Sequence, residues 1–146
     1  MQTAIDQFQN NIGQAYQLVL LYRKFGGMVT SAIDLSDMLR AALVMGVSAL
    51  DHYVHEVVRL GMIETQQGKR TPTDAFKKFR VTLDNAIYQS KTVLTWLESE
   101  IIEQHNWRSF QEPDKVAEAM KLICSIQLWE EVAKKQGTTA KDIKDR

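Results

Sequence analysis

The sequence has few of the residues that cross-link a small protein. Cys124 is the only cysteine, which excludes an intrachain disulfide and a metal site built from several thiolates. The longest apolar run, 41–50, is far below the about 20 residues that span a bilayer. Residues 1–14 are too polar for a secretion signal. We therefore expect a cytosolic protein without a membrane-spanning helix.

An excess of either charge is also absent. Lys plus Arg and Asp plus Glu number 18 each, so no overall field draws the protein toward nucleic acid or a membrane. Any site for a polyanion must come from local clustering. The seven glycines form no P-loop, dinucleotide fingerprint or nucleophile elbow, so no cofactor is predicted. Length and an ordinary apolar content indicate one globular domain over residues 1–146.

Apolar residues recur at helical spacing along most of the chain. They predict an all-α, up-and-down bundle of about five to six helices. A first helix is expected over 3–25. A long central second helix is expected to begin after Asp34 or Ser36, either of which can cap it, and to run to about Gln67. Small residues in 41–49 would let another helix approach this second helix closely. Its inward stripe is predicted to be Leu35, Leu39, Leu43, Gly46, Leu50, Val54, Val57 and Met62.

The second half of the sequence predicts shorter helices. Thr71 is expected to cap a short helix that ends near Phe79, and 81–89 is either a turn or another short helix. Another helix is expected over 92–107. A further one begins at Pro113 and either continues to Lys135 or breaks near Cys124.

The sequence closes on the start of one more helix. Thr139 and Asp142 form a capping box, and Ala140 and Ile143 begin a new apolar stripe. The sequence then stops after barely two turns at Arg146, too few for a stable helix alone. We expect that it is cut inside this helix.

The densest polar cluster lies in the middle of the long second helix, at 51–56. Asp51, His55 and Arg59 fall in one series four residues apart, on one face of a helix. A carboxylate one turn before a histidine can orient the imidazole for acid–base work or phosphate binding. The alternative, commoner for such a cluster alone, is a solvated helix face. The histidine spacing is not that of a zinc-binding helix, so no metal site is predicted.

Basic residues gather around the loop and short helix that follow. They could contact phosphates, with Tyr88 or Trp107 stacking a base, although such groups are usually plain soluble surface. These basic residues are Lys69, Arg70, Lys77, Lys78 and Arg80.

The stretch 38–59, MLRAALVMGVSALDHYVHEVVR, resembles the HEPN superfamily, in particular its RiboL-PSP-HEPN branch. WRSFQEPDKVAEAM at 107–120, LWEEVA at 128–133 and GTTAKD at 137–142 fit the same branch. The resemblance covers most of the chain from about Leu20 onward. It implies a helical bundle that pairs through its long helices into a homodimer.

Many members of this superfamily are metal-independent endoribonucleases of toxin–antitoxin and phage-defence systems. The resemblance therefore implies RNA and a cognate antitoxin protein as partners, and no small-molecule cofactor. The family signature is an Arg followed about four to six residues later by a His, on the last long helix. Two such motifs meet in the dimer cleft. There the His would help to activate the ribose 2′-hydroxyl or protonate the leaving oxygen, and the Arg would stabilise the charge that develops on the phosphate.

This sequence departs from the signature, because no Arg in its 146 residues is followed by a His at that spacing. The catalytic pair is expected beyond Arg146, and the chain by itself is expected to be inactive. The resemblance carries over only Asp51 and His55, as supporting residues. We expect RNA contacts from Arg59, Lys69, Arg70, Lys77 and Lys78.

Two other functions stay open at this point. One is a non-catalytic HEPN-like module that dimerises and binds RNA or a protein. The other is an unrelated helical bundle with a structural role. The sequence does not specify an RNA target, an antitoxin or a physiological trigger.

Overall fold

Helices account for all the regular structure in the described part of the chain. The computed structural model describes residues 1–28, 34–82, 93–105 and 108–144, and these ranges contain seven helices and no strand. The predicted all-α class is confirmed. The region 83–89, Tyr88 and Trp107 lie outside the described residues. The chain divides into two compact units, Met1–Tyr53 and Val54–Arg146, which are described separately below.

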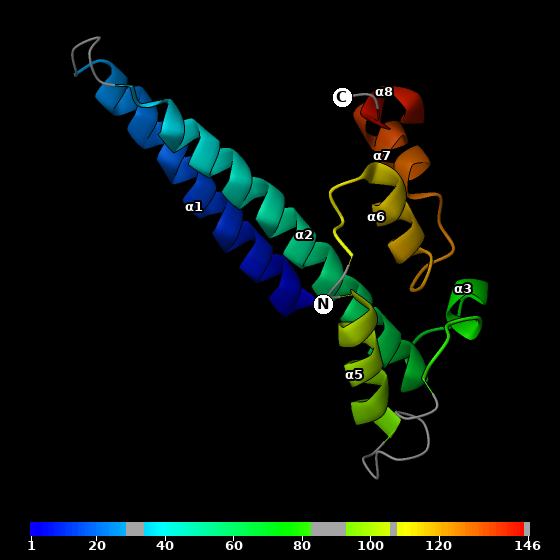
Figure 1. Cartoon of the computed structure of the whole chain (residues 1–146). Coiled ribbons are helices and arrows are strands. Elements are labelled where there is room, and N and C mark those ends of the chain that lie inside the picture. Colours follow the sequence, from blue (N-terminus) through cyan, green and yellow to red (C-terminus); the bar gives the residue numbers. More distant parts are fainter. Residues whose placement is uncertain (29–33, 83–92, 106–107, 145–146) are drawn as a thin grey trace. The chain divides into compact units, whose positions relative to one another are not determined.

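The first unit is a hairpin of two long helices. Helix α1 (Gln2–Gly26) lies beside the first half of α2 (Ser36–Gln66), and the two run in opposite directions (Figure 1). Buried alanines line the contact: Ala4, Ala15, Ala42 and Ala49. At the far end from the connection, the rings of Phe8 and Tyr53 pack with centroids 4.8 Å apart. Of the small residues predicted to let another helix approach α2, Ala42 and Ala49 are buried, whereas Ala41 and Ser48 are exposed.

The predicted inward stripe of α2 is wrong in its first half. Leu39, Leu43 and Leu50 are exposed, because the contact with α1 uses the alanine row instead. Leu43 follows Ala42 directly, and one residue turns a helix by about 100°. The leucines therefore point to one side of the hairpin. In the second half, the predicted stripe holds, and Val57 is among its buried members.

The second unit packs short helices and the end of α2 around a small core. Its helices are α3 (Asp74–Lys77), α5 (Val93–His105), α6 (Pro113–Met120), α7 (Leu128–Gln136) and α8 (Ala140–Lys144). Its most buried apolar side chains are Val58, Met62, Ile101 and Phe110. No helix in the described ranges has the length and apolar character needed to cross a membrane.

The predicted cap of α3 is displaced by two residues. Thr73, not Thr71, is the N-cap: its Oγ1 accepts from the Phe76 N–H at 3.0 Å and donates to the Leu122 carbonyl at 3.2 Å. The second bond is a tertiary contact, and it selects between two threonines that local sequence rules treat alike. The helix ends at Lys77, before the predicted end.

The open question about the segment after Pro113 is resolved in favour of a break. Helix α6 ends at Met120, and α7 begins at Leu128. The Trp129 Nε1–H donates to the Pro113 carbonyl at 2.8 Å and ties α7 to the start of α6. Gly137, with φ 66°, ends α7 in the left-handed conformation that glycine tolerates.

The predicted capping box of the last helix is confirmed. The Asp142 N–H donates to Thr139 Oγ1 at 3.2 Å, and the Thr139 N–H donates to Asp142 Oδ2 at 3.3 Å. These reciprocal bonds satisfy backbone donors at the start of α8.

Candidate nucleic-acid interface

The two residues that the resemblance marks as supporting lie four apart on α2. Asp51 belongs to the first unit and His55 to the second, and both are half-buried. The His55 ring packs against Phe110, with centroids 4.5 Å apart, and lies 5.6 Å from the ring of His105. His55 therefore belongs to an aromatic cluster of the second unit. A supporting role in catalysis for Asp51 and His55 stays a prediction.

His105 is the buried member of this cluster, at the end of α5. Its side chain is 4% exposed and meets the edge of Phe110. Burial lowers the pKa of His105 to about 4, and the nearby charges of His55 and Arg108 act in the same direction. The imidazole is therefore neutral at neutral pH.

This burial predicts a specific pH dependence of stability. The unfolded chain binds a proton at His105 near pH 6.5, whereas the folded chain does so only near pH 4. The free energy of unfolding should therefore fall by about 3 kcal/mol as the pH drops from 6.5 to 4, with no contribution above that window. Urea unfolding of the wild type and of His105→Gln across this range measures it, and the variant should have the shallower slope.

The exposed His52 supplies the control for this measurement. His52→Gln should retain the wild-type dependence on pH. Equal slopes for the wild type and His105→Gln would contradict the assignment to His105.

The predicted RNA contact Arg59 is held in a network of carboxylates. Its Nε and Nη2 donate to Glu56 at 3.0 and 2.8 Å, and its Nη1 pairs with Glu98 of α5. The hydrogen bonds that Arg59 donates to Glu56 raise the pKa of Arg59 further. This guanidinium therefore joins α2 to α5, and a phosphate would have to compete with two carboxylates for it.

Two other predicted contacts are paired in the same way. Arg70 Nε lies 2.6 Å from Glu64 Oε2, and Lys77 Nζ lies 3.2 Å from Asp74 Oδ1. Lys69 is exposed and forms no ion pair among the described residues. Pairing reduces the field that these cations project toward a phosphate, but surface pairs are weak and can reopen.

The remaining predicted contact, Lys78, lies on a pocket of about 320 Å³ in the second unit. Four exposed cationic side chains and one carboxylate, Glu118, contribute to its lining, and we name it the basic pocket. Its uncharged walls include Phe79, Leu122 and the buried His105. The four cations are Lys78, Arg80, Arg108 and Lys121.

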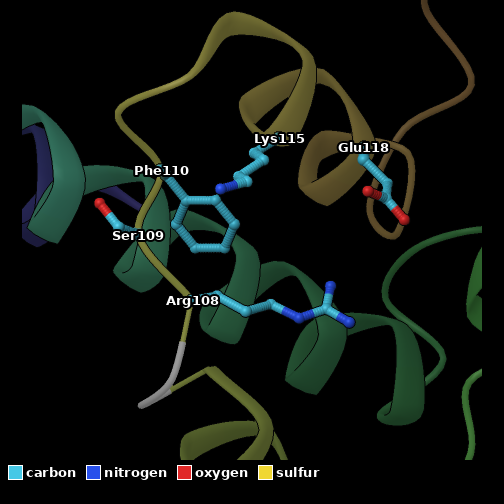
Figure 2. Close-up of a pocket in the computed structure, with 5 residues that line it drawn as sticks. All are labelled: Arg108, Ser109, Phe110, Lys115 and Glu118. Atoms are coloured by element: carbon cyan, nitrogen blue, oxygen red, sulfur yellow. The ribbon is translucent and has the colours of Figure 1, made fainter.

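Arg108 also lines a neighbouring pocket of about 210 Å³. Figure 2 shows its side chain extended beneath the ring of Phe110, with Lys115 and Glu118 coming from α6 above it. Lys115 donates to Glu112 at 2.7 Å. Both pockets share Arg108 and Glu118, so an anion bound in either pocket would meet the Arg108 side chain.

The buried carboxylate of Glu100 holds in place the irregular segment that carries Arg80. Glu100 is 1% exposed and accepts from the Thr82 N–H at 3.1 Å and the Thr82 hydroxyl at 2.9 Å. Gln104 Nε2 donates both to Glu100 and to the Arg80 carbonyl, each at 2.7 Å. These bonds hold residues 80–82 against α5 and so place Arg80 at the rim of the basic pocket.

The first unit offers a second candidate surface, which is apolar. Six exposed apolar side chains of α1 and α2 point to the same side of the hairpin when they are counted at about 100° per residue from the buried alanines, whereas the exposed Leu21, Phe25 and Val44 point elsewhere. Tyr16 is 54% exposed and Leu43 is 69% exposed. We name this surface the apolar side of the hairpin. It consists of Ile12, Tyr16, Leu20, Leu39, Leu43 and Leu50.

A metal centre finds no support in the described ranges, where no three His, Cys, Asp or Glu side chains gather to hold an ion. The half-buried Cys124 donates to the Met120 carbonyl at 3.2 Å. Comparisons with family models, with curated proteins and with solved structures find no match to this chain.

Proposed function

We propose that this chain is the scaffold of a HEPN-type, metal-independent endoribonuclease of the toxin or phage-defence kind, and that it works as a homodimer. The observation that carries the proposal is the apolar side of the hairpin. Large apolar side chains that line one side of two long helices are typical of a protein-binding surface. Pairing through long helices is what the HEPN resemblance implies.

The division of labour follows from the residues present. The 146 residues supply the dimer surface and cationic groups for RNA, but they contain no Arg followed by a His at the family's spacing, so the proposal requires that the Arg and His that cut the strand come from outside this sequence. His55 would support that pair from α2, together with Asp51. A cognate antitoxin protein remains a proposed partner, and the cytosol the proposed location.

A non-catalytic module that dimerises and binds RNA or a protein is the second candidate. It is favoured by the absence of an Arg–His motif in the 146 residues and by the carboxylates that engage Arg59 and Arg70. The two candidates share the dimer and differ in cleavage.

Cleavage of labelled single-stranded RNA separates the two candidates. The 146-residue chain and the full reading frame of its gene are compared, each with and without EDTA. We expect the longer protein to cut, undiminished by the chelator, because general acid–base chemistry needs no metal. The shorter chain should bind without cutting.

Two results would count against the ribonuclease. Cleavage abolished by EDTA would require a different mechanism. A natural stop codon directly after Arg146, with binding and no cleavage, would establish the non-catalytic module.

A further inference from the structure

We propose that the basic pocket binds the phosphate group of a nucleotide, with Arg108 and Lys121 as its principal contacts. Two sources share this chemistry: a phosphodiester of single-stranded RNA and a free mononucleotide. The RNA source rests on the proposed function, whereas the phosphate site does not.

The charge balance of the pocket supports an anionic ligand. Four cations face one carboxylate, Glu118, in a protein whose total charges cancel. Within the part of the chain that the structure describes, Lys78, Arg80, Arg108 and Lys121 form no ion pair. Like charges that converge without carboxylate partners repel one another, and a bound phosphate relieves that repulsion.

The residue types suit a phosphate ester better than a simple ion. Arg108 presents a planar fork of N–H donors that matches two phosphate oxygens, while a lysine such as Lys121 acts as a compact point charge. Phe79 and Leu122 give the pocket apolar walls, against which a ribose or base can pack. The pocket therefore combines charge for the phosphate with surface for the nucleoside.

The pKa of the buried His105 should report phosphate binding in the same pocket. Its ring lines the pocket beside Arg108, and it is neutral at neutral pH. A phosphate held next to it favours the protonated imidazole, so binding should raise the pKa of His105. This shift can be followed without any substitution.

The test measures binding of a fluorescein-labelled oligouridylate of about 12 nucleotides by anisotropy. The wild type is compared with Arg108→Gln/Lys121→Gln, which removes two charges and keeps polar side chains. Affinity should fall by about 10-fold or more near 0.1 M salt. The slope of log affinity against log salt should fall by about 1.4, since each phosphate contact on a single strand contributes roughly 0.7.

Lys135→Gln/Lys141→Gln is the matched control. It removes the same charge from two exposed lysines of the same unit that do not line the pocket. Its affinity should stay within about 2-fold of the wild type. Equal losses in both double variants would mean diffuse attraction to positive charge and would overturn the pocket.

Binding measurements with two further ligands, AMP and an oligoglutamate peptide, identify the source of the phosphate. Binding of AMP alone that is sensitive to the pocket variant, with no tighter binding of the oligouridylate, supports the site with a mononucleotide as ligand. Pocket-dependent binding of an oligoglutamate peptide, with neither AMP nor RNA bound, would overturn the proposal in favour of an acidic protein partner.

An NMR titration of His105 in the wild type tests the pocket without any substitution, so its result does not depend on the folding of a variant. Its pKa should rise when the oligouridylate or AMP is present. No response of His105 at saturating ligand would overturn the pocket.

Failure of this proposal can be told apart from failure of the ribonuclease. Pocket-dependent binding without cleavage by any length of the protein removes only the ribonuclease. Cleavage by the longer protein with an unchanged KM in the pocket variant removes only the pocket.

Discussion

Replacing Leu43 with glutamate is expected to turn the proposed homodimer into a monomer. Leu43 is 69% exposed in the single chain, so the substitution should cost the folding of one chain little. In the dimer it would bury a carboxylate among apolar side chains such as Tyr16 and Leu39, at a cost of several kcal/mol. The dissociation constant should therefore rise by about 100-fold or more. Sedimentation velocity over a range of concentrations measures this change.

Ile126→Glu is the control for the Leu43 substitution. Ile126 is 49% exposed, belongs to the second unit and is not one of the residues that form the apolar side of the hairpin. This variant should sediment as the wild type does. A Leu43→Glu protein that retains both its helicity and the wild-type dimer would show that this side of the hairpin is not the interface.

The Gly61→Ala substitution in α2 is expected to lower the free energy of unfolding by about 2 kcal/mol or more. A Cβ at this position would lie 2.6 Å from Ile123 Cγ2 and 2.9 Å from Ile123 Cβ. Ile123 is buried and its branched side chain has few alternative rotamers, so backbone must shift to make room. Urea unfolding, followed by circular dichroism, measures the loss.

Gly13→Ala provides the contrast in α1. A Cβ there meets nothing within 4 Å, so the higher helix propensity of alanine should stabilise the protein by about 0.5–1 kcal/mol. The loss in the double variant Gly61→Ala/Ile123→Ala should be smaller than the sum of the two single losses, because the two methyl-bearing groups compete for one space. Equal effects of Gly61→Ala and Gly13→Ala would contradict the close contact.

The helices could be predicted from the sequence because their signals are local. The apolar periodicity of 3–25 and of the long second helix sets their extents, and α2 begins at Ser36, within one residue of the predicted starts after Asp34 or Ser36. The box of Thr139 and Asp142 likewise depends only on residues three apart. Local rules are sufficient where the stabilising bonds are local.

The two errors both come from tertiary contacts. Thr73 replaces Thr71 as a cap because its hydroxyl also reaches the Leu122 carbonyl, 49 residues away along the chain. In the first half of α2, the row of alanines packs on α1, whereas the prediction placed the more apolar row of leucines there. Periodicity finds apolar rows, but it does not determine which row meets a neighbouring helix within the same chain.

The candidate site was only partly accessible to sequence reasoning. Lys78 and Arg80 stood out because they cluster within one loop and short helix. Arg108 and Lys121 each follow the end of a helix and carry no pattern of their own, and only packing brings them to the same pocket. Pairing with carboxylates, as at Arg59, is equally invisible in the sequence.

The mass of the wild-type protein in solution tests pairing through the long helices most directly. Sedimentation equilibrium at micromolar concentrations should give about 33 kDa, which is twice the 16.7 kDa of one chain. A mass of 16.7 kDa that persists at concentrations of about 100 μM would contradict a homodimer.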